Sequence, residues 1–140
     1  MLEIIRDVEL HYTHLVDPQS PFGTPQWDLL LKTDSEETKN QLESLGLKPK
    51  ADGDKWKVNV KRKTQSAKGE PMDPPVVLDS NKEPMAEADV KSIGNGSKGN
   101  IKVFKYDWNV GGRQGTNSML VAVQVTDYIK YEGGGGDVDF

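Results

Sequence analysis

Hydrophobic and polar residues alternate with a two-residue period along much of this chain, which is typical of half-buried β-strands. The first two such segments cover residues 3–16 and 25–33. One face of the first is predicted to carry Ile4, Arg6, Val8, Leu10 and Tyr12, and one face of the second Trp27, Leu29 and Leu31. The same pattern predicts further strands over residues 54–64, 74–80, 100–110 and 116–131.

One segment between these strands has a helical pattern instead. Asp34 is followed three residues later by Glu37, which resembles a capping box, and Gly46 is a typical residue just past a helix end. The short apolar stripe between these signals consists of Leu42 and Leu45. We therefore predict a helix over about residues 35–45.

Five or six strands with one inserted helix fit a small antiparallel barrel or a sandwich. We predict a mainly β protein with a single OB-fold-like barrel of five to six antiparallel strands, an architecture that is partly open in its five-stranded form. The glycine-rich residues 111–115 would join the last two strands as a hairpin, and the polar segments 65–75 and 81–92 would be loops. Residues 1–131 would form this domain, and residues 132–140 a flexible, glycine-rich acidic tail that ends in phenylalanine.

The composition indicates a thin core under a charged surface, with 34% hydrophobic and 29% charged residues. The chain has no cysteine, which excludes disulfides and thiolate metal sites. No apolar run approaches the roughly 18 residues that span a membrane. The first residues, "MLEIIRDVEL", are acidic where a signal peptide would be basic and then apolar. We expect a soluble intracellular protein with no membrane contact.

The net charge of −4 conceals a strong segregation of charge along the chain. Residues 48–68 hold eight lysines and arginines against two aspartates, and residues 91–113 hold five against one aspartate. Local charge, rather than the total, sets the field that a polyanion meets. A nucleic-acid partner is therefore compatible with this acidic protein.

The residues that could carry catalysis are not arranged for it. His11 and His14 would point to opposite faces of a strand, which makes them poor partners for one metal ion. The segment "GNGSKG" (94–99) lacks the spacing of a phosphate-binding loop. No Ser/His/Asp spacing or carboxylate pair stands out. We therefore expect no enzyme, no metal and no other cofactor.

Binding of single-stranded nucleic acid has more support. Proteins of this class combine a positive groove that follows the backbone with aromatic faces on which bases stack. Lysines repeat along one face of residues 54–64 at about 6.5–7 Å, similar to the phosphate spacing of an extended single strand. Phe104, Tyr106 and Trp108 share one face of residues 100–110. The predicted phosphate contacts are Lys57, Lys61, Lys63, Lys102, Lys105 and Arg113, and the predicted stacking residues are Tyr106 and Trp108.

The same residues allow other interpretations. The lysines could simply solvate the outer face of a half-buried strand, while the aromatic rings fill the core. Trp56 is predicted in the core because it alternates in register with Val58 and Val60. The chain would then be a structural or interaction module without a nucleic-acid ligand. A barrel that binds single-stranded RNA is a further alternative.

Five short segments add to this pattern. They are "PFGTP" (21–25), "VVLDSNKEPM" (76–85), "IGNGSKGNIKVFKYDWN" (93–109), "SMLVAVQVTDYIKYEGGGG" (118–136) and "DVDF" (137–140). In this order they resemble the single-stranded DNA-binding proteins of short-tailed lytic phages, which serve a phage-encoded replisome.

The resemblance implies an oligonucleotide-binding core that coats and protects single-stranded DNA during phage DNA replication, recombination and repair. It also implies a homodimer in the cytoplasm of the infected bacterial host. By the same resemblance, the tail would contact the phage DNA polymerase and helicase-primase through Asp137, Asp139 and Phe140. Tails of that family are longer and more acidic, so we expect the Phe140 ring to matter more here than the charge.

Overall fold

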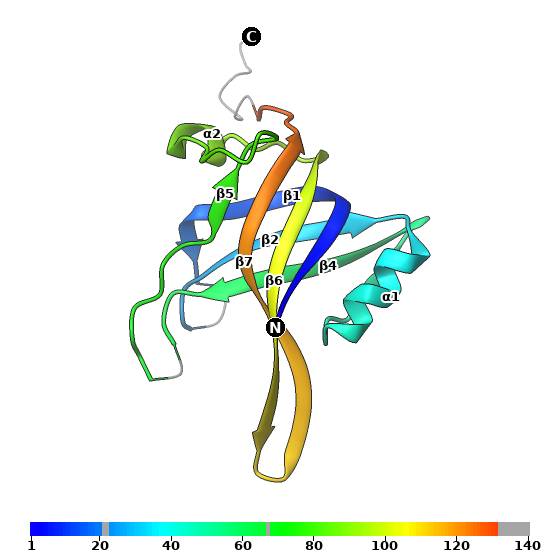
Figure 1. Cartoon of the computed structure of the whole chain (residues 1–140), viewed down its shortest axis with the longest axis vertical. Helices are drawn as coiled ribbons and strands as arrows, with labels where there is room; N and C mark the ends of the chain where they lie inside the picture. Colours follow the sequence, from blue (N-terminus) through cyan, green and yellow to red (C-terminus); the bar gives the residue numbers. More distant parts are fainter. Residues whose placement is uncertain (21–22, 67, 132–140) are drawn as a thin grey trace.

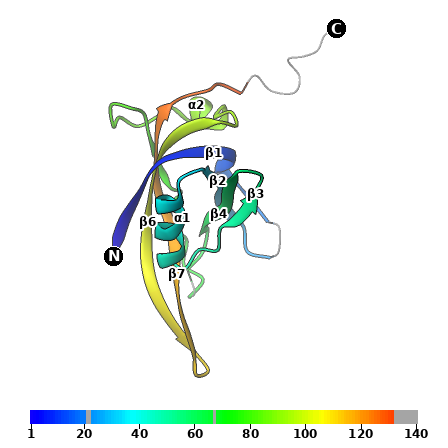
Figure 2. The ribbon, with the colours of Figure 1, turned by 90° about the vertical axis from the view of Figure 1, so that its right-hand side faces the viewer.

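The sheet and its two helices are seen in a computed structural model that describes residues 1–20, 23–66 and 68–131. Within these residues the elements are β1 (Leu2–Gln19), β2 (Gln26–Thr33), α1 (Glu36–Ser44), β3 (Lys50–Asp52), β4 (Lys55–Lys63), β5 (Val76–Leu78), α2 (Glu87–Lys91), β6 (Ser97–Val110) and β7 (Arg113–Asp127). One sheet contains all the strands in the order β3-β4-β2-β1-β6-β7-β5. It coils so that β2 and β4 lie behind β6 and β7 (Figures 1 and 2). The mainly β fold is therefore confirmed.

The predicted barrel is wrong in strand number and in closure. The described sheet has seven strands rather than five or six, and it is not closed. Two short strands occupy its edges: β3, which was not predicted, and β5, which lies within the strand predicted over residues 74–80. β5 pairs in parallel with β7, with Val77 opposite Val123, and β3 pairs with β4, with Ala51 opposite Trp56. β4 and β7 are not hydrogen-bonded neighbours in this order, so the described sheet is open between them.

A side chain spans the seam between β4 and β7 instead of a backbone ladder. Arg62 of β4 donates from Nε to the carbonyl of Asp73 at 2.7 Å. Its Nη1 donates to the carbonyl of Leu120 on β7 at 3.4 Å. The guanidinium has several donors in a fixed plane, so it can hold two separate backbone segments at once.

Two bulges bend β1. Asp7 and Tyr12 have positive φ angles of 57° and 48°, a conformation that L-residues rarely adopt. The backbone N–H of Asp7 donates to Asn100 Oδ1 at 3.0 Å, and that of Tyr12 donates to Asn95 Oδ1 at 2.8 Å. The register of β1 shifts at both places, against β6 at the first and against β2 at the second. These bends let one long strand pair with both neighbours as the sheet coils.

The first bulge also overturns the predicted face of β1. Ile5 is fully buried, whereas Ile4 is 39% exposed and points out of the core. Val8 and Leu10 are buried as predicted, but Tyr12 is 63% exposed. The extra residue at the bulge changes the phase of the alternation, so residues on its two sides cannot share the predicted face.

The core lies between the two layers of the coiled sheet. Trp27, Leu29 and Leu31 of β2 are buried on one face, as predicted. Trp56, predicted in the core, is only half-buried, and Lys39 Nζ lies 5.6 Å from the centre of its ring. The other buried apolar side chains include Leu15, Val60, Val77, Val90, Ile93, Ile101, Val103, Leu120, Val123 and Val125.

The predicted helix is present as α1, with its cap shifted by one residue. Ser35, rather than Asp34, is the N-cap, and its Oγ accepts from the backbone N–H of Thr38 at 3.2 Å. Gly46 follows the helix with a φ of 81°, as the predicted stop requires. The predicted stripe of Leu42 and Leu45 is fully buried.

The predicted loop over residues 81–92 contains a second helix, α2, so the expectation of one helix is also wrong. Its five residues are too few to show a helical period in the sequence, and its apolar contact is one buried residue, Val90. Neither helix in the described part of the chain has the length and apolar character needed to cross a membrane.

The predicted hairpin between β6 and β7 is confirmed. Val110 pairs with Arg113 across a two-residue turn, in which Gly111 and Gly112 have φ angles of 59° and 82°. Positive φ at both positions is the requirement of a type I′ turn, whose twist matches that of the flanking strands. The hairpin extends beyond the rest of the sheet (Figures 1 and 2).

We predict that Gly46→Ala destabilises the protein far more than Gly112→Ala, although the two glycines have φ angles of 81° and 82°. A Cβ at Gly46 would overlap the carbonyl of Thr116 on β7, whereas a Cβ at Gly112 would meet nothing within 4 Å. Backbone strain alone costs about 1–2 kcal/mol at either site. Urea unfolding should therefore show a loss of about 1–2 kcal/mol for Gly112→Ala and a clearly larger loss for Gly46→Ala. Equal losses would contradict the close packing of Gly46, just past the end of α1, against Thr116 of β7.

Candidate nucleic-acid interface

Three aromatic side chains stand on the outer face of β6. Phe104, Tyr106 and Trp108 are each about two-fifths exposed, at 39%, 41% and 40%. They alternate with Ile101 and Val103, which are fully buried in the core. The rings are therefore on the solvent side of the sheet, where a ligand can reach their faces.

The tryptophan ring is supported by the facing strand. Trp108 is opposite Gly115 of β7, and a Cβ on this glycine would lie 2.7 Å from the indole Cζ2. The ring thus packs directly over the glycine backbone. A larger residue at position 115 would displace it, so the small residue keeps the indole against the sheet and its other side open.

A groove brings these rings together with lysines of β4. It has a volume of about 690 Å³ and runs between the end of β4, residues Gln65, Ser66, Gly69 and Met72 after it, and the β6–β7 ladder. Lys61 and Lys63 of β4 line it together with Phe104 and Tyr106 of β6. The remaining wall includes Thr24, Asn117 and Met119. We call this the ring groove.

The position of the ring groove follows from the topology. In OB-folds, oligonucleotides bind the face of the second and third barrel strands and the loops after the first and fourth strands. Those strands are β2 and β4 here, and the β6–β7 hairpin corresponds to the later loop. Thr24, in the connection from β1 to β2, and Lys61 and Lys63, on β4, all line the groove.

The lysines of the ring groove carry uncompensated charge. Neither Lys61 nor Lys63 makes an ion pair with any residue that the structure describes. Asp28 is the cross-strand neighbour of Lys61, but its carboxylate lies 3.0 Å from His14 Nδ1. The same carboxylate accepts hydrogen bonds from the amides of Gln19 and Gln26 at 2.9–3.0 Å. Its charge is thus shared among these partners, and the ammonium of Lys61 remains available.

The structure places the other predicted site residues differently. Lys102 lies on the outer face of β6, in the same row as Tyr106 and Trp108. Lys57 is on the same face of β4 as Lys61, but it lies nearer the start of the strand and does not line the groove. Lys105 alternates with the aromatic row and pairs with the buried Ser118, and Arg113 begins β7 at the hairpin turn.

Other residues of the groove were missed in the sequence but could have been found. Phe104 was recognised as sharing a face with Tyr106 and was not included among the contacts. Asn117 and Met119 are opposite Tyr106 and Phe104 in the ladder. A two-residue turn at Gly111–Gly112 fixes that register, so counting outward from the turn identifies both residues. The loop residues of the groove carry no comparable signal.

Alternative chemistry has little support in the described residues. No group of three or more His, Asp or Glu side chains is placed to hold a metal ion in residues 1–20, 23–66 and 68–131. Both histidines have carboxylate neighbours, His11 with Glu9 at 3.1 Å and His14 with Asp28 at 3.0 Å. Their polar contacts are structural links within β1 and between β1 and β2.

Comparison with solved structures identifies proteins of the same fold. The single-stranded DNA-binding protein of bacteriophage Enc34, solved in complex with single-stranded DNA, is 14% identical with a TM-score of 0.66, over 94% of this chain and 89% of that chain. The single-stranded DNA-binding protein gp2.5 of bacteriophage T7 is 16% identical with a TM-score of 0.64, over 98% of this chain and 92% of that chain. No family model and no curated protein sequence matches the chain. The resemblance inferred from the sequence is thus confirmed at the level of the fold.

One lysine of β4, Lys55, forms an ion pair with Glu9, and we predict that its removal lowers the thermal stability in a pH-dependent way. Lys55 Nζ donates to Glu9 Oε2, and this hydrogen bond lowers the pKa of Glu9 below its ordinary value. A lowered carboxyl pKa stabilises the fold above the unfolded-state pKa, and that contribution is lost as the pH falls through the folded-state value. Lys55→Gln should therefore lower the thermal midpoint at pH 7, and the difference from the wild type should shrink below about pH 5.

The matched control for this measurement is Lys61→Gln on the same strand. Lys61 has no ion pair in the described chain, so its replacement should leave the pH dependence of the midpoint unchanged. A Lys55→Gln effect of constant size between pH 7 and pH 3 would show that the ion pair with Glu9 is not its cause.

Proposed function

We propose that this protein binds single-stranded DNA without sequence preference, through the outer face of β4, β6 and β7. The observation that carries the proposal is the ring groove, which is lined by two lysines without an ion pair among the described residues and by two half-exposed aromatic rings. This combination is the one that single-strand binders use. The shared fold with phage single-stranded DNA-binding proteins supports the same conclusion.

In this proposal, the lysines bind phosphates and the rings stack on bases. Lys61 and Lys63 provide ammonium groups, and Tyr106 and Phe104 offer ring faces in the same groove. Trp108 continues the row toward the hairpin. Every base has a π-face, so stacking tolerates any sequence. A lysine ammonium binds a phosphate as a point charge, and the phosphates are the same in every sequence. Binding of this kind coats and protects exposed single strands, as replication, recombination and repair require.

The lysines and arginine outside the ring groove have a smaller part in the proposal. Lys57, Lys105 and Arg113 remain predicted phosphate contacts at the borders of the bound strand. Electrostatic attraction to a polyanion extends about 8–10 Å in physiological salt, so cations near the groove can still aid association. Their replacement should cost less affinity than that of Lys61 or Lys63.

Two alternatives make different predictions for the same surface. A barrel specific for RNA would bind poly-U more tightly than poly-dT, because it would contact the 2′-hydroxyl. A structural or interaction module would retain neither polymer at low salt. The exposed rings favour a stacking ligand over this second alternative, since such rings would otherwise be expected in the core.

The test is a titration of tryptophan fluorescence with oligo-dT at several salt concentrations. We expect Tyr106→Ala to weaken binding by about 1–3 kcal/mol, the value of one stacked base. The double variant Lys61→Gln/Lys63→Gln should lower the log–log salt slope by about 1.4, since each phosphate contact contributes about 0.7 on a single strand. The control is Tyr12→Ala, which removes another exposed tyrosine outside the groove. A wild-type affinity for oligo-dT that does not change with salt concentration would contradict the proposal.

We also propose that the carboxyl-terminal tail recruits replication proteins. Asp137, Asp139 and Phe140, the predicted docking residues, lie outside the described residues. The last described residue has a defined place, because the N–H of Tyr131 donates to the carbonyl of Ser92 at 2.5 Å. From this anchor, nine residues reach about 30 Å when fully extended. The anchor is at the end of the sheet opposite the β6–β7 hairpin (Figure 1).

Deletion of residues 132–140, or Phe140→Ala alone, should leave oligo-dT affinity within about twofold and abolish capture of the phage DNA polymerase and helicase-primase. The physical reason is that burial of the apolar Phe140 ring in a partner contributes more binding free energy than solvent-exposed ion pairs of the two aspartates would. The reciprocal control is Phe104→Ala, which should lose DNA affinity and retain partner capture. Undiminished capture after the deletion would reject the role of the tail.

A further inference from the structure

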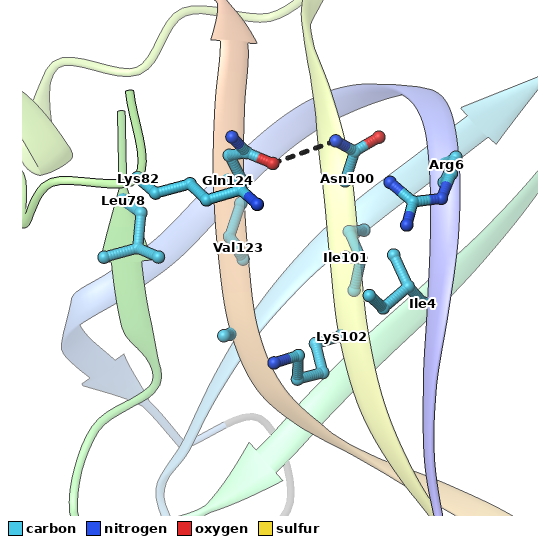
Figure 3. A pocket seen from close by; sticks show the side chains of 10 residues that line it. Ile4, Arg6, Leu78, Lys82, Asn100, Ile101, Lys102, Val123 and Gln124 are labelled. Atoms are coloured by element: carbon cyan, nitrogen blue, oxygen red, sulfur yellow. Dashed lines mark hydrogen bonds between the residues drawn. The ribbon is translucent and has the colours of Figure 1, made fainter. Parts of the chain in front are cut away.

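A second groove lies on the outer face of the sheet, on the side away from the hairpin. It is formed between β1, β6, β7 and the segment after β5, and has a volume of about 190 Å³ (Figure 3). Its walls include Ile4, Arg6, Leu78, Lys82, Lys102 and Gln124. We call it the cationic groove.

Three cations from three separate parts of the chain meet at the cationic groove. Arg6 comes from β1, Lys102 from β6 and Lys82 from the turn after β5. None of the three makes an ion pair with a residue that the structure describes, and no acidic side chain lines the groove. Unpaired cations placed together repel one another, so the site favours a ligand with negative charge.

The position of Lys82 is built by a tight turn. The carboxylate of Asp79 accepts from the backbone N–H groups of Asn81 at 2.8 Å and Glu83 at 3.0 Å. Within this turn Lys82 has a φ of 65°, and its N–H donates to the carbonyl of Asp79 at 2.9 Å. The turn holds the lysine backbone beside β7, where its side chain reaches over the groove (Figure 3).

The rest of the groove is an apolar floor with a satisfied polar wall. Ile4, Leu78 and Ala122 supply aliphatic surface. The amides of Asn100 and Gln124 are hydrogen-bonded to each other at 3.0 Å, so they shape the wall rather than require a ligand (Figure 3). A volume of about 190 Å³ is below the 300–1,000 Å³ of pockets that enclose drug-sized molecules or cofactors. The space suits one small flat group next to an anion.

The cationic groove and the ring groove belong to one surface. Along β6, the outward residues Lys102 and Phe104 are neighbours, the first lining the cationic groove and the second the ring groove. Along β7, Ala122 is opposite Lys102 and lines the cationic groove, whereas Met119 is opposite Phe104 and lines the ring groove. A polymer lying lengthwise on the β6–β7 ladder would therefore pass from one groove into the other.

We propose that the cationic groove is a further nucleotide subsite, in which Arg6, Lys82 and Lys102 bind phosphate and the apolar floor takes a base or sugar. This inference rests on the proposed binding of single-stranded DNA. It implies that the strand follows β6 and β7 lengthwise from the hairpin toward β5. The aromatic row from Phe104 to Trp108 spans about 13–14 Å at 6.5–7 Å per outward residue. That length corresponds to about three nucleotides, so a longer oligonucleotide is needed to occupy the cationic groove as well.

The test compares dT4 with dT12 on the full chain carrying Arg6→Gln/Lys82→Gln. For dT12 we expect an affinity loss on the order of tenfold at low salt and a log–log salt slope lower by about 1.4, because two phosphate contacts are removed. Binding of dT4 by the aromatic row should change less than about twofold. The single variant Arg6→Gln should lower the dT12 slope by about 0.7 and also serves if the double variant is unstable.

The matched control is Lys50→Gln/Lys98→Gln, which removes two positive charges that line neither groove. If the Arg6→Gln/Lys82→Gln protein binds dT12 with the affinity and slope of this control, the nucleotide subsite is overturned while the ring groove stands. If the wild type fails to bind dT12 at low salt, the proposed function and this inference are both overturned.

Discussion

The bending of β1 by two side-chain hydrogen bonds is the constraint on which the architecture depends. A straight strand of this length could not follow the coil of the sheet and pair with β2 on one edge and β6 on the other. Asn100 and Asn95 accept the backbone N–H groups that the bulges at Asp7 and Tyr12 free from the ladder. A buried backbone N–H without a hydrogen-bond partner destabilises a folded protein. The hydrogen bonds to these two amides therefore offset part of the strain of the positive φ angles. The coil that results encloses the core between β2, β4 and the β1–β6–β7 layer.

The same bend decides which side chains face outward on the binding surface. It turns Ile5 into the core and leaves Ile4 and Arg6 on the outer face, next to Lys102. The aromatic row of β6 continues this face toward the hairpin, so cations and rings follow one another along a pair of strands. The core is made almost entirely of Leu, Ile and Val, and the fold tolerates three half-exposed rings outside it. Large apolar surface left in solvent is typical of a binding site.

Much of the fold and part of the site were predictable because they depend on local rules. The periods of β2 and β6, the helix over 35–45 and the glycine turn all follow from short-range patterns that tertiary contacts did not override, whereas the bulges of β1 changed its predicted face. The hairpin register is local as well, so Asn117 and Met119 could have been placed opposite the aromatic row. By contrast, β3 and α2 are too short to show a period, and the strand predicted over 74–80 carries no local sign that it pairs in parallel with β7. The prediction of a five- to six-stranded barrel failed because nothing local shows that β3 and β5 occupy the edges of an open sheet.

The sequence by itself determined the alternation that puts Tyr106 and Trp108 on one face of β6 and Lys61 and Lys63 on one face of β4. Only the tertiary structure decided that the two faces meet in one groove, while Lys57 and Lys105 stay outside it. It also revealed Arg6, because the bulge that turns this residue outward depends on an asparagine more than ninety positions away. Periodicity is a property of neighbours along the chain, whereas a binding surface is a property of neighbours in space.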